Sequence, residues 1–159
     1  MNAPKKTNAV RLLDSLHIPY TLHPYPVEEE DVSAAHVALT LGVPTALLFK
    51  TLVARGDKTG ILVCCVPGDR ELGLKALAQA SGNKNVALVA MKEILPLTGY
   101  IRGGCSPLAM KKLYPTYIDQ SIETMSAVMV SAGVRGLQIK LSPMHLIDAA
   151  GASLHPLCL

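Results

Sequence analysis

The sequence predicts one mixed α/β domain, and three observations support this class. A length of 159 residues suits a single domain and leaves little room for two. Half of the residues are hydrophobic and 17% are charged, so the chain can bury a core without disulfides or metals. Short apolar strand patterns alternate with helical patterns and turn signals. With no Trp and a single Phe, Phe49, the core must be aliphatic.

Helical spacing and capping residues predict four helices and one short helical turn. The helices are expected at about residues 8–16, 32–41, between 69 and 82, and from 143, with the turn starting near 91. Gly42 is expected to cap the second helix at its C-terminus. We expect Asp69 to cap the third helix at its N-terminus and Ser142 with Pro143 to open the last.

Seven strands are expected from runs of apolar and β-branched residues. They cover about residues 20–25, 47–54, 61–66, 85–90, 115–119, 127–131 and 137–141. The run at 47–54 is apolar on both faces, which predicts a central strand. GDKTG at 56–60 predicts a hairpin turn to the next strand. The segment 97–108 has no clean period and is rich in Gly, Ser and Pro, which predicts a loop.

Charge and cysteine usage limit the class of partner. The net charge of +3 permits a transfer-RNA partner without requiring one. The first ten residues contain no apolar h-region and no apolar run is long enough to span a bilayer, so no membrane contact is expected. The four cysteines show no CxxC or Cys/His metal spacing. We therefore expect a cytoplasmic protein without a metal site.

Lys50 is the most informative residue of the predicted central strand. Leu48 and Leu52 flank it on its own face, because side chains alternate along a strand. A buried ammonium is costly unless it is paired or functional, which favours a functional lysine. In the alternative, the strand lies at a sheet edge and Lys50 extends its ammonium to water. This segment alone supports the two interpretations about equally.

Two glycine-containing segments are candidate parts of a binding site. Consecutive glycines in GGCSP, residues 103–107, permit positive φ and a close approach of a ligand to the backbone. Their free N–H groups would hold a carbonyl oxygen as it gains negative charge. In VSAGVRG, residues 130–136, Arg135 suits phosphate contacts. An ordinary turn is the alternative for both segments and the more common one in isolation.

Other catalytic motifs are absent from the sequence. The chain lacks GxSxG, a Walker loop and GxGxxG, and its five histidines are scattered outside any metal pattern. Cys105 is a candidate nucleophile, but no histidine lies near it in sequence to act as a general base. A serine-hydrolase triad and a nucleotide-phosphate loop therefore have no local support.

Four segments in this order resemble the YbaK-type family of bacterial Cys-tRNA(Pro) deacylases: FKTLV, TGYIRGGCSPLAMKK, PTYID and VSAGVRGL. The resemblance covers nearly the whole chain, and the spacing from Gly103 to Pro107 matches the GxxxP loop of that superfamily. It implies a mixed, partly closed sheet flanked by helices, as in the editing domain of many bacterial prolyl-tRNA synthetases. It also implies one deacylase domain over residues 1–159, which needs no cofactor and hydrolyses the ester between cysteine and the terminal ribose of transfer RNA.

The resemblance also implies roles for individual residues. It assigns Lys50, Gly103 and Gly104 to catalysis. Lys50 would contact the aminoacyl end of the transfer RNA, and the loop from Gly103 to Pro107 would bind the carbonyl oxygen of the ester. The implied substrate-binding residues are Thr51, Tyr100, Cys105, Ser106, Pro107, Ser131, Arg135 and Gln138. Gln138 stands where the family often has Asp, which removes a negative charge near the pocket. The family loop commonly has an aliphatic residue at position 105, and the substrate's own thiol is thought to attack its carbonyl.

The implied partners are Cys-tRNA(Pro), Cys-tRNA(Cys) as a further substrate, and prolyl-tRNA synthetase in a complex. Two alternatives stay open at this stage. One is a deacylase with specificity for Ala or Ser, because pocket volume is not visible in the sequence. The other is a non-catalytic module of the same fold that binds RNA or protein. Turnover of charged transfer RNA separates the enzyme from the binding module.

Overall fold

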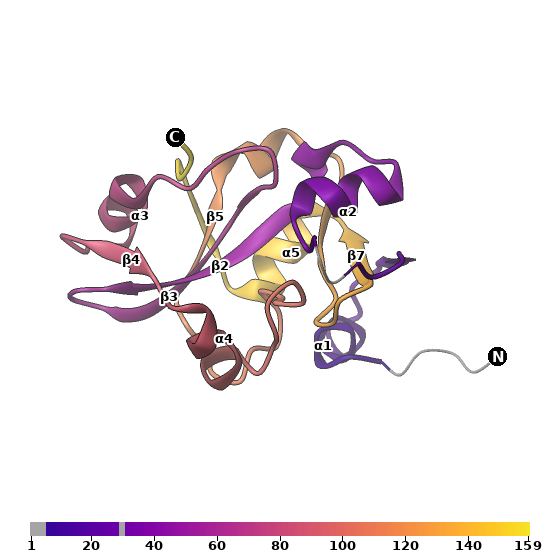
Figure 1. Ribbon diagram of the computed structural model, residues 1–159, viewed down its shortest axis with the longest axis horizontal. Helices are drawn as coiled ribbons and strands as arrows, with labels where there is room; N and C mark the ends of the chain where they lie inside the picture. Colours follow the sequence, from indigo (N-terminus) through magenta and orange to yellow (C-terminus); the bar gives the residue numbers. More distant parts are fainter. Residues whose placement is uncertain (1–5, 29–30) are drawn as a thin grey trace.

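The computed structural model describes residues 6–28 and 31–159 and has the mixed α/β class that the sequence predicts (Figure 1). The strands are β1 (Thr21–Pro24), β2 (Phe49–Gly56), β3 (Gly60–Pro67), β4 (Val86–Leu88), β5 (Thr116–Asp119), β6 (Val128–Ser131), β7 (Leu137–Leu141) and β8 (Ser153–His155). The α-helices are α1 (Asn8–Ser15), α2 (Ala34–Leu41), α3 (Leu74–Ser81), α4 (Met91–Thr98) and α5 (Pro143–Ala150). None of these helices is long and apolar enough to cross a membrane, as judged over the described ranges.

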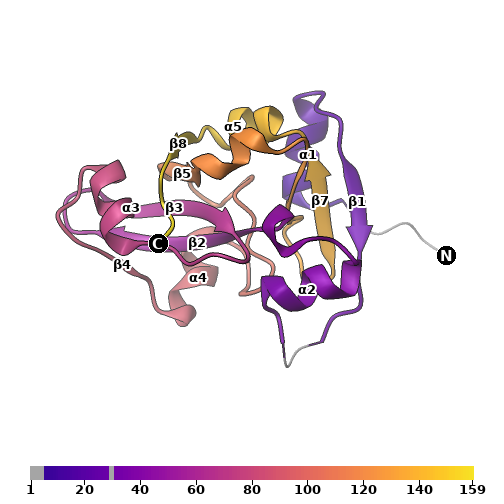
Figure 2. The same ribbon diagram turned by 90° about the horizontal axis from the view of Figure 1, so that it is seen from above.

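The strands form two sheets that meet where β2 begins. One sheet has the order β4-β2-β3-β5-β8 and the other β1-β7-β6. Leu48, the residue before β2, forms a parallel bridge to Met129 in β6. The partly closed sheet that the resemblance implies is therefore built as two sheets joined at this bridge. Figure 2 shows α2 and α4 on the same side of β2, with α5 and β8 on the other side.

β2 is central along one half of its length and exposed along the other. It pairs with β3 over all of its residues, from Phe49 to Gly56. On its other side β4 pairs only with Ala54 to Gly56, and the bridge to β6 ends at Leu48. Between these two neighbours, no strand in the described chain pairs with residues 49–52 on that side. This stretch of free edge carries Lys50.

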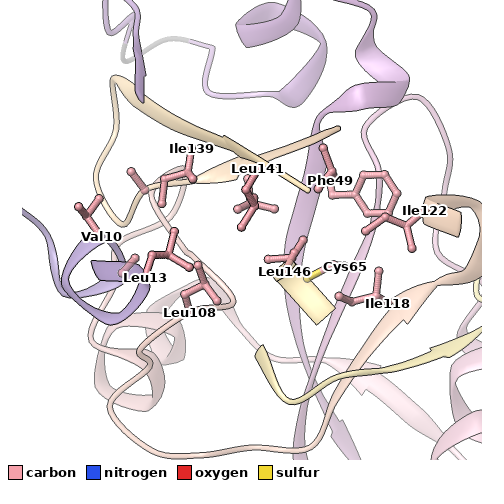
Figure 3. Packing of buried hydrophobic residues seen from close by; sticks show 14 of the residues in the cluster. Val10, Leu13, Phe49, Cys65, Leu108, Ile118, Ile122, Ile139, Leu141 and Leu146 are labelled. Carbon is pink, nitrogen blue, oxygen red and sulfur yellow. The ribbon is translucent and has the colours of Figure 1, made fainter. Parts of the chain in front are cut away.

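The main hydrophobic core fixes the start of β2 (Figure 3). Val10 and Leu13 of α1, Ile139 of β7 and Leu146 of α5 belong to one buried cluster with Phe49. Burying an aliphatic side chain of this size stabilises the fold by about 1.5–3 kcal/mol. Because Phe49 belongs to this cluster, the residues that follow it in β2 are held in a fixed place.

Local signals placed most helix ends correctly. Gly42 caps α2 with φ +70°, and Pro143 is the first residue of α5 after Ser142, as predicted. The turn expected near residue 91 is the longer helix α4. The strand expected at 47–54 begins two residues later, at Phe49, because Thr45–Leu47 form a 3-10 turn.

Two features of the chain differ from the prediction because of long-range pairing. Asp69 does not cap α3, which begins at Leu74 after Gly73. The preceding segment instead pairs with the C-terminal segment, since the N–H of Gly73 donates to the carbonyl of Leu157 at 2.7 Å. Strand β8 was not predicted; it has three residues and pairs in parallel with β5. Neither pairing has a local sequence signal.

Candidate active site

A cavity of about 520 Å³ lies along the free edge of β2. One wall comes from β2, and others come from β4 with the first turn of α4 and from strands β6 and β7. Residues 31–34, which lead into α2, and the glycine loop at 103–107 complete the lining. Pockets of about 300–1,000 Å³ take whole small molecules rather than single side chains. The cavity therefore has room for more than one chemical group of a ligand.

The lining of this cavity has a polar part and an apolar part, which we call the polar arm and the apolar arm. The hydroxyl of Thr51 lies 3.8 Å from the sulfur of Cys65, so Thr51 points to the face of the sheet that carries Cys65. Lys50 and Leu52 point to the opposite face, because side chains alternate along a strand. The polar arm is lined by Thr51, Cys105, Ser131 and Gln138. The apolar arm has Leu52 and Leu88 from the face of the sheet opposite Thr51. It also has Met91 and Ile94 of α4, a helix that is bonded through Glu93 to Arg55 on the face that carries Thr51.

Lys50 also lines the cavity and is partly exposed. Val66 of β3 pairs with it on one side, and its other side is the free edge. The strand lies inside the sheet, yet its free edge gives the ammonium a route to water, so the functional role of Lys50 stays a prediction. Lys50 forms no ion pair with a carboxylate in residues 6–28 and 31–159. Its charge is therefore available to a ligand.

The segment at the glycine loop lines the cavity with Arg102, Gly103 and Cys105 but not with Gly104. Gly103 and Cys105 line it, whereas the N–H of Gly104 donates to the carbonyl of Ile101 at 3.0 Å. The expectation of a free N–H at Gly104 is therefore wrong, because the turn uses this donor. Within the described chain, the N–H groups of Gly103 and Cys105 have no hydrogen-bond partner. These two are the donors that the loop can offer to a ligand.

Both loop glycines are required by the space around them. Gly103 has φ +83°, and a Cβ there would lie 3.0 Å from the Cβ of Val32 and 3.1 Å from Nε of Arg135. A Cβ on Gly104 would lie 3.1 Å from backbone atoms of Val134 and Arg135. The loop therefore packs against the turn after β6 at a distance that larger residues do not permit without movement.

Five of the implicated residues do not line the cavity: Gly104, Tyr100, Ser106, Pro107 and Arg135. Nε of Arg135 donates to the carbonyl of Arg102 at 2.8 Å. The buried Tyr100 donates its hydroxyl hydrogen to the carbonyl of Leu108 at 2.6 Å, and the Ser106 hydroxyl accepts from the N–H of Leu108 at 3.3 Å. These bonds hold the shape of the loop. Contact of these residues with a substrate stays a prediction.

Ser131 and Gln138 face each other across β6 and β7 in the polar arm. Their side chains are deeply buried, with residue exposures of 9% and 6%. The Ser131 hydroxyl accepts from the N–H of Gly133 at 3.1 Å. The side-chain carbonyl oxygen of Gln138 is buried without a hydrogen-bond partner in the described chain. Such an acceptor costs about 1–3 kcal/mol when unpaired, so a donor from a ligand would stabilise the site.

Cys105 keeps its proton at neutral pH. Burial raises the pKa of its thiol to about 11, although a hydrogen bond with Thr98 opposes the change. The histidines of the described chain do not line the cavity, so Cys105 has no general base beside it. The described residues also hold no group of three side chains that could bind a metal ion. The site therefore offers hydrogen bonds, the positive charges of Lys50 and Arg102 and the carboxylate of Asp31 to a ligand, without an activated cysteine.

Sequence reasoning missed most of the apolar arm. Leu88, Met91 and Ile94 line the cavity, and the first two are 51% and 62% exposed. Met91 and Ile94 are three residues apart, which is a signal for one side of a helix. That signal was assigned to the end of a strand and a helical turn, and only the three-dimensional structure shows that it borders the site.

The mixed α/β fold thus holds a cavity whose lining offers hydrogen-bonding groups, charged side chains and apolar side chains to a ligand. The chain belongs to the family of the aminoacyl-tRNA editing domain, whose model matches residues 28–149. It is an aminoacyl-tRNA deacylase, a hydrolytic editing enzyme whose substrate is an aminoacyl-tRNA.

Individual relatives agree with this family. EbsC of Enterococcus faecalis, by its name a candidate Cys-tRNA(Pro)/Cys-tRNA(Cys) deacylase, is 48% identical over 144 residues, which cover 91% of this chain and 88% of EbsC. The proline–tRNA ligase of Fervidobacterium nodosum is 34% identical over 79 residues, 50% of this chain and 14% of the ligase. Among solved structures, a candidate trans-editing enzyme for prolyl-tRNA synthetase superposes on this chain with a TM-score of 0.82. The two sequences are 22% identical, and the match covers 98% of this chain and 99% of that enzyme, which shows that the fold is shared.

Proposed function

We propose that this deacylase removes cysteine from mischarged Cys-tRNA(Pro), with Cys-tRNA(Cys) as a further substrate. The observation that carries the proposal is the polar arm, where an unpaired Gln138 oxygen and two unpaired loop N–H groups border a space without an activated nucleophile. The name of the relative EbsC supports cysteine as the amino acid.

In this proposal the aminoacyl group occupies the polar arm. The N–H groups of Gly103 and Cys105 bind the carbonyl oxygen of the ester as it becomes negatively charged. The carbonyl oxygen of Gln138 accepts a hydrogen bond from the α-ammonium group of the cysteine. A charge-assisted hydrogen bond of this kind contributes about 1.5–3 kcal/mol. Positioning accounts for much of the rate, since an aminoacyl ester is already activated.

The cysteine substrate supplies the nucleophile in this mechanism. Its sulfur attacks the carbonyl carbon of its own ester, and the bond from that carbon to the ribose oxygen breaks. The proton of the thiol passes to the ribose oxygen, which leaves free transfer RNA and a β-thiolactone. Water then opens the thiolactone to cysteine. The protonated state of Cys105 supports this scheme, because a thiol with a pKa of about 11 is a poor competitor as nucleophile.

Lys50 contacts the aminoacyl end of the transfer RNA in this proposal. It lines the cavity, and its ammonium has no carboxylate partner in the described chain. A positive charge at this point favours the oxygen atoms of the ester and of the terminal ribose–phosphate. Removal of the charge should therefore reduce the rate far more than it reduces stability.

A complex with prolyl-tRNA synthetase belongs to the same proposal. The stretch shared with a proline–tRNA ligase and the fold shared with a candidate trans-editing enzyme support it. A synthetase partner would deliver newly mischarged transfer RNA to the deacylase, which suits a protein with a net charge of only +3.

Deacylation of a panel of charged transfer RNAs tests the function. Cys, Ala, Ser and Pro are each attached to tRNA(Pro), and the loss of ester is followed with the purified protein. We expect Cys-tRNA(Pro) to react at least about tenfold faster than the others, because only cysteine carries a thiol nucleophile. Faster release of Ala or Ser would overturn the cysteine assignment, and no release of any amino acid would support the non-catalytic module.

A further inference from the structure

We propose that the carboxylate of Asp31 binds the α-ammonium group of the aminoacyl ester and so supplies the negative charge that Gln138 does not carry. This inference rests on the proposed function, since the ammonium belongs to the aminoacyl group in the polar arm. It adds to that function a residue from the segment before α2, to which neither the sequence motifs nor the family resemblance assigns a role.

The charges that line the cavity leave the ammonium in need of a carboxylate. Lys50 and Arg102 line the cavity, and both would repel a positively charged amino group. Gln138 offers an oxygen atom but no charge, and it stands where the family often has Asp. Among the described residues that line the cavity, Asp31 is the only carboxylate. It is therefore the group that can balance the charge of the ammonium.

The contact of Val32 with the glycine loop places Asp31 beside the reacting ester. A Cβ on Gly103 would lie 3.0 Å from the Cβ of Val32, so the segment at 31–34 packs directly against the loop. In the proposed function the N–H of Gly103 binds the carbonyl oxygen of the ester. The carbon that carries the ammonium is bonded to that same carbonyl carbon, so the ammonium also lies near the loop. Asp31, one residue before Val32, lines this cavity as well.

Local hydrogen bonds keep the Asp31 carboxylate charged and oriented. Its Oδ1 accepts from the N–H of Ser33 at 3.0 Å, which closes a short turn before α2. Hydrogen bonds from the side chain and the backbone of Ser33 hold the pKa of the Asp31 carboxyl below its usual value, so the group is ionised at neutral pH. The Ser33 hydroxyl also accepts from the N–H of His36 at 3.2 Å. The carboxylate is thus fixed by bonds at the start of a helix.

The Asp31 carboxylate keeps acceptor positions for a ligand. Its Oδ2 lies 3.8 Å from Nδ1 of His36, which is too far for a hydrogen bond. The other ring nitrogen of His36, Nε2, lies 3.2 Å from Glu28, so the imidazole stands between two carboxylates. An ionised carboxylate has about four acceptor positions and an ammonium has three donors. The substrate can therefore donate to Asp31 and to the Gln138 oxygen together.

The experiment removes the charge of Asp31 and the amino group of the substrate, separately and together. Asp31→Asn keeps an oxygen for the N–H of Ser33. The substrate β-mercaptopropionyl-tRNA(Pro) keeps the thiol and the ester of Cys-tRNA(Pro) but has no ammonium. We expect Asp31→Asn to lower kcat/KM for Cys-tRNA(Pro) roughly 3- to 15-fold, since the carboxylate is half-exposed. With the substrate that lacks the amino group, the wild-type protein and Asp31→Asn should have equal kcat/KM.

Glu28→Gln is the matched control for this experiment. Glu28 carries the same charge and also contacts His36, but it does not line the cavity. Its variant should keep the wild-type kcat/KM for both substrates. A loss in Glu28→Gln as large as that in Asp31→Asn would overturn the inference, because net charge or the contact with His36 would then explain it. An equal loss in Asp31→Asn with both substrates would also overturn it, because Asp31 would then act only on the shape of its segment.

A binding measurement separates this inference from the proposed function. Two stable analogues carry cysteine or β-mercaptopropionate in amide linkage to the ribose of adenosine. The wild-type protein should bind the cysteinyl analogue roughly 3- to 15-fold more tightly, and Asp31→Asn should bind both equally, whether or not the protein turns over Cys-tRNA(Pro). Equal affinities of the wild-type protein for the two analogues, or no binding of either, would overturn the inference even if deacylation is normal.

Discussion

Gln138 of β7 lies opposite Ser131 of β6. Within the described chain, the side-chain oxygen of Ser131 has a hydrogen-bond partner, whereas that of Gln138 has none. The Ser131 oxygen accepts from the turn that follows β6, whereas the Gln138 oxygen remains unpaired in a buried position. In the proposed complex the α-ammonium of the substrate completes this pair.

Gln138→Met should reduce activity without reducing stability. Methionine is close to glutamine in size but has no carbonyl oxygen, so kcat/KM should fall roughly 10- to 150-fold, the equivalent of a charge-assisted hydrogen bond. The free energy of unfolding in urea should stay equal or rise, because an unpaired buried acceptor is removed. Gln138→Glu keeps an acceptor and should stay closer to the wild-type activity. Full activity in Gln138→Met would remove Gln138 from substrate binding.

Lys50→Ala should abolish most deacylation in a folded protein. Lys50 has no ion pair to lose within the described chain, so its removal should change the free energy of unfolding by less than about 1 kcal/mol. We expect a fall in kcat/KM of at least about 100-fold. Lys140→Ala removes an exposed lysine of β7 and serves as the control for net charge. Near-normal turnover by Lys50→Ala would show that the charge is not used.

The sequence predicted local features of the fold and of the site better than long-range ones. The periodic helices and the cap at Gly42 depend on neighbouring residues, and the structure has them. The pairing of Gly73 with Leu157 and the strand β8 depend on contacts between distant segments, which no local pattern records. The same difference holds in the site, where the glycine loop was visible in the sequence but the engaged N–H of Gly104 and the apolar arm were not.

Gly103→Ala should reduce catalysis more than an equally strained substitution elsewhere. Gly99 has the same φ of +83°, but a Cβ there would meet only the Cβ of Lys111, at 3.7 Å. Both variants should lose about 1–2 kcal/mol of stability from the left-handed backbone, and Gly103→Ala should lose more because its Cβ also crowds Val32. Only Gly103→Ala should also lower kcat, by an expected 10-fold or more, because it moves a loop that binds the carbonyl oxygen. Equal kinetics for the two variants would reduce this loop to a structural turn.

Arg135→Ala should raise the concentration of transfer RNA needed for half-maximal rate, with a smaller change in kcat. Within residues 6–28 and 31–159, the guanidinium of Arg135 is bonded through one nitrogen only, Nε, which leaves its other donors for a phosphate. If Arg135 contacts one phosphate, the salt dependence of binding should become less steep by about one unit. A fall in kcat with an unchanged salt slope would instead assign Arg135 to holding the loop at Arg102.

The identity of the nucleophile is tested by the dependence of rate on pH. The rate rises tenfold per pH unit below the pKa of the attacking thiol and levels above it, since the thiolate is the reactive form. An ordinary cysteine thiol, such as that of the substrate, has a pKa of about 8.5, whereas burial raises the pKa of Cys105 to about 11. The two nucleophiles therefore predict different profiles between pH 6.5 and 9.5.

The most direct test measures kcat over this range for the wild-type protein and Cys105→Ala, each with Cys-tRNA(Pro) and Ser-tRNA(Pro), after subtraction of the uncatalysed rate. We expect Cys105→Ala to match the wild-type protein on Cys-tRNA(Pro), with both rate profiles levelling near about pH 8.5. Both proteins should release serine poorly, because a hydroxyl is a much weaker nucleophile than a thiolate. An inactive but folded Cys105→Ala, with a wild-type rate that still rises at pH 9.5, would contradict attack by the substrate's own thiol.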